Sequence, residues 1–170
     1  MKIFRSDLQR FEEPRHFRES LFDIGIHDLG NPETPVELEL QVRPQGEDFL
    51  LNGVVRTNLT LTCDRCLGEA PYAVDGKFSL WLVAEMRPDL DANEEEILLV
   101  PTHQQEVDLA GTIAETIRIE IPQKTLCRED CKGLCPSCGA DLNRQPCGCA
   151  TEEIDERLSA LLAIKKQLEK

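Results

Sequence analysis

The feature that most constrains the fold of this sequence is the crowding of its cysteines. Six of the eight lie between residues 127 and 149, and the other two frame the short run Cys63-Asp-Arg-Cys66. The full set is Cys63, Cys66, Cys127, Cys131, Cys135, Cys138, Cys147 and Cys149. Tetrahedral zinc takes four ligands, and thiolates two or three residues apart can converge on one ion. Eight thiols therefore predict two structural zinc ions.

The chain around the second group of cysteines is poor in apolar residues. Between Cys127 and Cys149 it offers little to bury beyond Leu134, Ala140 and Leu142. Such a segment cannot offset the entropy of ordering by hydrophobic burial. A structural zinc ion contributes roughly 10–16 kcal/mol in small peptides. We therefore expect the metal to be the core of this segment.

Cysteine spacing also indicates how the thiols divide between two sites. Cys135-Pro-Ser-Cys138 is followed by Cys147-Gly-Cys149, and these four thiols can close a local site because glycines let the backbone fold back. The second site would then comprise Cys63, Cys66, Cys127 and Cys131, and it would fasten two distant parts of the chain together. Spacing alone leaves open an exchange of Cys131 for another thiol.

Hydrophobic periodicity predicts a sheet in the first half of the chain. Apolar and polar residues alternate over 36–42, over 49–63 and over 72–83, and turn residues separate these runs. They predict an antiparallel meander that curls into a small barrel or sandwich. A helix is expected near 108–119, capped by Asp108, and a last helix from about Thr151. The predicted class is α+β, with a β-rich domain at 1–121 and a Cys-rich zinc-bound segment plus C-terminal helix at 122–170.

Charge and hydropathy limit the compartment and the partners. The net charge is −13, and residues 85–96 look like a solvated acidic loop with six acidic residues and one basic residue. Residues 122–149 instead hold four basic residues against three acidic ones, so any contact with an anion would be local. No apolar run of about 18 residues is present, and the first twenty residues are charged. We expect a cytoplasmic protein without a membrane segment, and reduced thiols there favour metal over disulfides.

Other interpretations of the cysteines are weaker. Buried thiols can be small hydrophobic residues, but six in so short a segment argue against packing alone. A thiol-redox function normally requires a βαβ context, and neither Cys-x-x-Cys pair has one. The spacing of Cys131, Cys135 and Cys138 also occurs in radical iron–sulfur enzymes, but the repeated strand-helix units of a partial barrel are missing. A zinc deaminase needs His-x-Glu, which none of the three histidines provides.

Several motifs, taken in order, resemble a known family. They are Cys63-Asp-Arg-Cys66-Leu67, the run from Leu126 through Cys131-Lys-Gly-Leu-Cys135-Pro to Cys138-Gly-Ala-Asp-Leu-Asn143, then Cys147-Gly-Cys149 and Asp155-Glu-Arg157-Leu158. This pattern resembles the bacterial and plastid YceD family, the large ribosomal RNA subunit accumulation proteins. The family often has Asp-Pro-Arg where this chain has Asp155-Glu156-Arg157, which affects only the start of the last helix.

The resemblance implies a noncatalytic ribosome-biogenesis factor that promotes accumulation of 23S rRNA, by binding precursor rRNA or the maturing large subunit. Our hypothesis for RNA binding is that Arg128, Lys132 and Arg144 contact phosphates around the zinc sites, together with basic residues in the first twenty positions. The alternative is a zinc-stabilised adaptor whose acidic surface binds a basic ribosomal protein. An enzyme is not expected.

Overall fold

The computed structural model describes residues 1–85 and 96–149, and its main element is a five-stranded sheet in the order β2-β3-β4-β5-β6. The first four strands are antiparallel neighbours, whereas β6 pairs parallel to β5. The strands are β2 (Arg15–Ser20), β3 (Pro35–Gln45), β4 (Asp48–Thr62), β5 (Glu69–Val83) and β6 (Glu96–Leu99). The α+β class and the antiparallel meander are confirmed, and the sheet is open, with β2 and β6 at its edges.

The three long strands form where the alternation predicts them. In β3 the apolar side chains of Val36, Leu38, Leu40 and Val42 are buried, and the polar residues between them are exposed or half-buried. Gly46, with φ +69°, makes the tight turn into β4, a backbone conformation that suits glycine. The period of two therefore turns one face of the sheet toward the core and leaves the other in water.

Four more elements, two of them from residues 106–120, lie close in space to the N-terminus. They are β1 (Lys2–Phe4), α1 (Arg5–Leu8), β7 (Glu106–Asp108) and α2 (Ala110–Glu120). Strands β1 and β7 pair antiparallel as a separate two-stranded sheet. The predicted helix is present but starts two residues after Asp108, which ends β7. The Asp108 carboxylate nevertheless accepts a hydrogen bond of 2.9 Å from the Ala110 backbone N–H.

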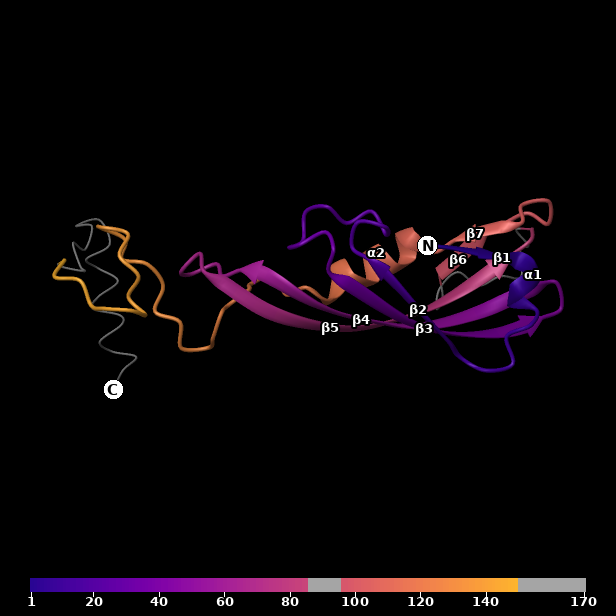
Figure 1. Cartoon of the computed structure of the whole chain (residues 1–170), viewed down its shortest axis with the longest axis horizontal. Helices are drawn as coiled ribbons and strands as arrows, with labels where there is room; N and C mark the ends of the chain where they lie inside the picture. Colours follow the sequence, from indigo (N-terminus) through magenta and orange to yellow (C-terminus); the bar gives the residue numbers. More distant parts are fainter. Residues whose placement is uncertain (86–95, 150–170) are drawn as a thin grey trace, which may run out of the picture.

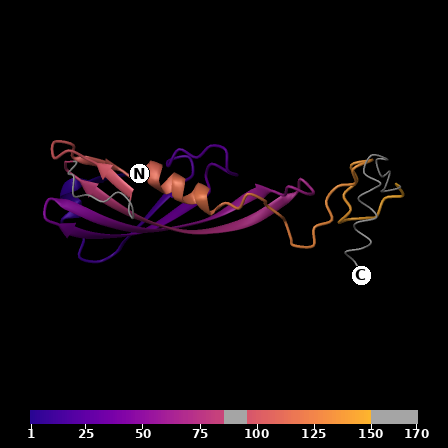
Figure 2. The same cartoon turned by 180° about the vertical axis from the view of Figure 1, so that it is seen from behind.

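Helix α2 covers one face of the sheet (Figures 1 and 2). Its residues Ile113 and Ile117 are fully buried and belong to the same core as Leu51 and Leu80 from the central strands. The helix approaches β5 closely at Gly76, where a Cβ atom would lie 2.6 Å from the Thr116 side chain. The core therefore lies between α2 and the sheet and contains none of the eight cysteines.

The β4–β5 hairpin is longer than the sheet that supports it. Strand β3 pairs with β4 only as far as Thr57, whereas β4 pairs with β5 as far as Thr62. The last part of the hairpin is thus a two-stranded arm that projects beyond β3, and the turn with Cys63 and Cys66 lies at its tip (Figure 1). This arm places the first thiol pair away from the main core.

Two sequence predictions fall wholly or largely outside the described residues: the C-terminal helix from Thr151 and most of the acidic loop near 85–96. The division into domains at residue 121 stays a prediction. Among the described residues, none of the helices has the length and apolar character needed to span a membrane.

Candidate metal centres

The eight thiols gather into two groups of four. In each group the sulfur atoms all lie within 4.8 Å of one another. The first centre consists of Cys63, Cys66, Cys127 and Cys131, and the second centre consists of Cys135, Cys138, Cys147 and Cys149. This is the grouping that the sequence spacing favoured, with Cys131 in the first centre.

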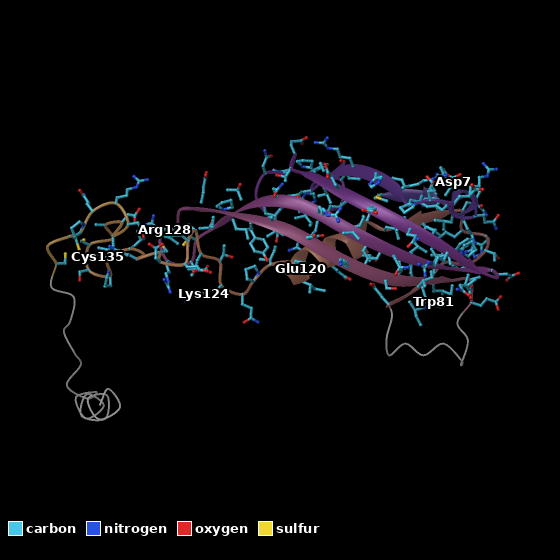
Figure 3. The ribbon with its side chains drawn as sticks, turned by 90° about the horizontal axis from the view of Figure 1, so that it is seen from below. Asp7, Trp81, Glu120, Lys124, Arg128 and Cys135 are labelled. Carbon is cyan, nitrogen blue, oxygen red and sulfur yellow. The ribbon has the colours of Figure 1, made fainter. Side chains whose placement is uncertain are left out.

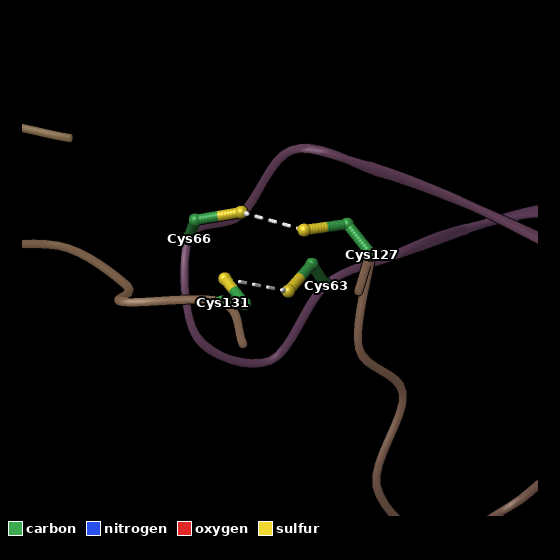
Figure 4. A group of neighbouring side chains, drawn as sticks. All are labelled: Cys63, Cys66, Cys127 and Cys131. Carbon is green, nitrogen blue, oxygen red and sulfur yellow. Dashed lines mark hydrogen bonds between the residues drawn. The ribbon is translucent and has the colours of Figure 1, made fainter. Parts of the chain in front are cut away.

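The sulfur separations of the first centre fit a tetrahedral ion. Cys63 Sγ lies 3.8 Å from Cys131 Sγ, and Cys66 Sγ lies 3.6 Å from Cys127 Sγ (Figure 4). Four thiolates at about 2.3 Å from one zinc ion would be about 3.8 Å apart, whereas a disulfide would bring two sulfurs to about 2.05 Å. The donor set therefore fits one zinc ion, for which these four thiolates would be the ligands.

The tip of the β4–β5 hairpin builds half of the first centre. The Leu67 backbone N–H donates to the Cys63 carbonyl at 2.9 Å, and the Cys63 N–H donates to the Gly68 carbonyl at 2.8 Å. Leu67 has φ +58°, a left-handed conformation that costs a non-glycine residue energy. This tight turn directs both thiols of the Cys-Asp-Arg-Cys run to the same side.

The chain that follows α2 docks on this turn through Asp64. The Asp64 N–H donates to the Thr125 carbonyl at 2.9 Å, and its carboxylate accepts from the Thr125 N–H at 2.6 Å. These two hydrogen bonds place Cys127 beside Cys66. Sequence reasoning missed this role of Asp64, because it depends on a contact between segments about sixty residues apart.

Arg65 holds the part of the chain that carries Cys131. Its Nη1 donates to the Cys131 carbonyl at 2.8 Å, and its own carbonyl accepts from the Leu134 N–H at 3.1 Å. Gly133 allows this approach, because a Cβ atom there would lie 2.9 Å from the Arg65 carbonyl oxygen. The residues between the two centres therefore lie directly against the hairpin tip.

Hydrogen bonding and burial separate the acidities of the first-centre thiols. The backbone N–H of Cys66 lowers the pKa of Cys63 to about 6, because it stabilises the thiolate. Burial, followed by the neighbouring sulfurs, raises the pKa of Cys127 to about 12. A thiol with the raised pKa of Cys127 keeps its proton at neutral pH, so metal binding to this sulfur releases a proton.

The second centre is a compact loop that, like the first, combines backbone hydrogen bonds with thiols of raised and lowered pKa. The Gly139 N–H donates to the Cys135 carbonyl, and the Cys135 N–H donates to the Ala140 carbonyl, both at 2.8 Å. The backbone N–H of Cys138 lowers the pKa of Cys135 to about 6, whereas the sulfur of Cys138 raises the pKa of Cys149 to about 12. These four thiolates likewise fit one zinc ion.

The three cations predicted to contact RNA are all exposed and lie on the Cys-rich segment, but they differ in their partners. Arg128 Nη2 donates to Asn143 Oδ1 at 2.8 Å, and its Nε lies 3.3 Å from the Asp130 carboxylate. Arg144 is 87% exposed and pairs with Asp141 at 3.5 Å. Among the described residues, the Lys132 side chain has no hydrogen-bond or ion-pair partner. Arg128 therefore helps to hold the segment together, whereas Lys132 and Arg144 point outward.

Two of the basic residues in the first twenty positions, Lys2 and Arg5, lie elsewhere. Figure 3 shows Asp7 and Arg128 at opposite ends of the molecule. Arg5 donates to the carbonyls of Val100 and Glu47, and Lys2 pairs with Glu106 at 3.0 Å. Lys2 and Arg5 therefore lie far from the Cys-rich segment (Figure 3).

Sequence reasoning also missed Asn143 as a site residue. Its side chain contacts Cys131, Arg128, Lys132 and Asp141, and so reaches from the second centre to the first. The only sequence signal was its place in the Cys-Gly-Ala-Asp-Leu-Asn run of the family pattern. An isolated asparagine in a loop carries no other mark of such a role.

The fold and the site define a class: a strand-rich protein with two closed four-thiol centres, one of which joins a sheet hairpin to the segment after α2. Residues 51–165 match the family model described as "Large ribosomal RNA subunit accumulation protein YceD". Because this match covers more than half of the sequence, the chain belongs to the YceD family.

Curated relatives agree with this assignment. A protein of Arabidopsis thaliana named large ribosomal RNA subunit accumulation protein YCED homolog 1, chloroplastic, is 30% identical over 161 residues, covering 80% of this chain and 50% of the relative. Its namesake in Zea mays is 32% identical over 162 residues, covering 79% and 55%. An uncharacterized protein of Mycobacterium tuberculosis is 31% identical over 128 residues, covering 75% and 60%. The chain spans about half the length of the plant relatives, and no solved structure matches it.

Proposed function

We propose that this protein is a noncatalytic factor that promotes accumulation of large-subunit ribosomal RNA, and that it binds precursor rRNA or the maturing subunit. The observation that carries the proposal is the family match over residues 51–165, which includes the hairpin arm and both thiol centres. The plant relatives, which are named large ribosomal RNA subunit accumulation proteins, support it. The most direct test is the ratio of 23S to 16S rRNA in cells without the protein, which should fall and be restored by the intact gene.

The two centres support a structural role for metal in this function. Each offers four thiolates, which complete a tetrahedral shell and leave no position for a substrate. Bound zinc would crosslink the Cys-rich segment to the hairpin arm, and the segment would then be held beyond the end of β3. A rigid, small, locally basic surface suits recognition of a large particle better than catalysis.

Lys132 and Arg144 are the proposed phosphate contacts. Both are exposed on the part of the chain that carries a small positive balance. Arg144 pairs only weakly with Asp141, because an exposed pair at 3.5 Å is screened by water, so a phosphate could compete for it. Arg128 is a poorer probe, since its removal would also disturb Asn143.

The RNA contact is tested with the double variant Lys132→Ala/Arg144→Ala. In filter binding to precursor 23S rRNA we expect a loss of affinity. The plot of log K against log salt, which falls, should become shallower by roughly 1.5 in slope, because two phosphate contacts are removed. The matched control is Arg43→Ala/Lys77→Ala, which removes the same charge from the exposed face of the sheet. Metal content should stay the same in both variants.

Full affinity and an unchanged salt slope in the Lys132/Arg144 variant would contradict this RNA contact. The adaptor alternative makes a different prediction: complexes with a basic ribosomal protein would survive nuclease treatment, and they would weaken when acidic rather than basic residues are replaced. An unchanged 23S to 16S ratio in cells without the protein would contradict both forms of the proposal.

A further inference from the structure

The two thiol centres are neighbours along the chain but belong to different parts of the structure. Cys131 is a ligand of the first centre and Cys135 of the second, and only three residues separate them. The connection is rigid on one side, because Leu134 donates to the Arg65 carbonyl and forms a bridge with Asp141. The centres are therefore close enough for a side chain from the loop that closes the second centre to contact a ligand of the first.

Asn143 is that side chain. It lies in the loop between Cys138 and Cys147, and its Nδ2 donates to Cys131 Sγ at 3.5 Å. Its Oδ1 accepts from the Lys132 backbone N–H at 2.8 Å, and from Arg128 Nη2 at 2.8 Å. The backbone N–H can only donate, so it requires the amide oxygen at that position and directs the NH2 group toward the sulfur.

Contacts within the loop between Cys138 and Cys147 hold Asn143 in position. Its backbone N–H and its Nδ2 donate to the Asp141 carboxylate at 2.9 and 2.8 Å. The neighbouring Leu142 N–H donates to the Gly133 carbonyl at 3.0 Å. This loop has few apolar residues to bury, so the thiolates at its two ends are what can hold it in place when they share a metal ion.

We propose that Asn143 couples the two metal centres, so that metal in the second centre raises the affinity of the first. A hydrogen bond to a ligand thiolate orients it and stabilises its charge, and loss of such an outer contact typically costs 10–100-fold in metal affinity. By thermodynamic linkage, metal in the first centre raises the affinity of the second by the same factor. Asn143 is thus a positioning residue that acts through Cys131.

The test is a double-mutant cycle on the full chain with Co²⁺ as the probe. The second centre is blocked with Cys147→Ser/Cys149→Ser. Because two four-thiolate centres absorb alike, the affinity of the first centre is measured in competition with a chelator from the paramagnetically shifted NMR signals of Cys63 and Cys66. In the intact protein Asn143→Ala should weaken the first centre about 10-fold or more. In the blocked protein the same substitution should have little effect, because Asn143 is no longer held in place. Gln145→Ala, in the same loop, is the matched control and should leave the affinity unchanged.

Asn143→Asp separates the thiolate contact from the rest of the loop. A carboxylate keeps the acceptor for Lys132 and Arg128 but replaces the donor to Cys131 with a negative charge. We expect this variant to weaken the first centre at least as much as Asn143→Ala. Wild-type affinity in Asn143→Asp, or an equal effect of Asn143→Ala with and without the second centre, would overturn the coupling. So would a first centre whose affinity does not change when the second is blocked. None of these outcomes bears on RNA binding.

Discussion

At the residue scale, two glycines with left-handed backbones serve different purposes in the Cys-rich segment. Gly133 has φ +75° and Gly139 has φ +72°. A Cβ atom on Gly133 would press against the Arg65 carbonyl oxygen, whereas nothing lies within 4 Å of such an atom on Gly139. One glycine therefore allows both a backbone conformation and a contact with the hairpin, and the other allows the conformation alone.

Alanine at these two positions should have unequal effects. Gly139→Ala should cost about 1–2 kcal/mol in the stability of the folded segment, because only the left-handed backbone is penalised. Gly133→Ala adds the clash with Arg65, so it should also separate the segment from the hairpin and weaken the first centre. Chelator competition on both variants measures this difference. Equal metal affinities would show that the contact with Arg65 does not hold the centre together.

Residue spacing favoured the observed division of the thiols, because sulfurs two or three positions apart have few ways to converge on one ion, but it left the place of Cys131 open. It was not enough for Arg65 or Asn143. Their functions depend on which parts of the chain meet at the hairpin tip, and that is decided by the length of β4 and β5. The ligand pattern is local in sequence, and the contacts that support it are not.

At the element scale, the long strands were predictable and the short ones were not. Alternation persists over most of β3, β4 and β5, so the apolar face is unambiguous. Strand β2 offers only Phe17 as an apolar residue, and β6 is four residues long, so neither shows a period. Their positions depend on the free edges of β3 and β5 rather than on their own sequences. The same holds for the parallel pairing of β6 with β5.

The central pair of strands is closely packed around one glycine. Gly53 lies opposite Phe78, and a Cβ atom at Gly53 would overlap the phenyl ring at 2.2 Å. We expect Gly53→Ala to destabilise the protein by about 1–3 kcal/mol in urea unfolding, because the ring or the strand must shift. The matched control is Gly111→Ala in the first turn of α2, where a Cβ atom meets nothing within 4 Å. It should leave the stability unchanged or raise it by up to about 1 kcal/mol. The same loss in both variants would contradict the packing at Phe78.

An ion pair between α2 and the loop before β3 should make stability depend on pH. Arg118 contacts the Asp28 carboxylate at 2.7 and 3.0 Å, and this hydrogen bond lowers the pKa of Asp28. A carboxyl group with a lowered folded-state pKa contributes stability above its unfolded value of 3.8, and the contribution is lost as the pH falls through the lowered pKa. Asp28→Asn should therefore reduce the Tm slightly at pH 7 and not at about pH 2. Glu33→Gln, in the same loop, is the control; a gap that persists in acid would contradict the ion pair.

At the scale of the whole molecule, the sheet and the Cys-rich segment rest on different interactions. The main core lies between α2 and the sheet, and a separate small cluster surrounds Cys63 and Cys131. Removing metal with a chelator should therefore unfold the segment after α2 and leave the sheet folded. The far-ultraviolet circular dichroism of the strands should persist, and the amide NMR signals of residues 125–149 should collapse to random-coil positions. Loss of the whole sheet on chelation would contradict this independence.

The first centre also closes a ring of chain, because it joins the hairpin tip to the residues just after α2. With a metal ion bound there, the end of α2 would be held by this closure in addition to its own packing against the sheet. The helix cannot move away from β5 unless the ring opens or the segment between α2 and Cys127 extends. Hydrogen exchange of the α2 amides should therefore be slow when zinc is bound and faster after chelation, although no residue of the helix touches the metal. Exchange in the helix would then report occupancy of a site at the tip of the hairpin.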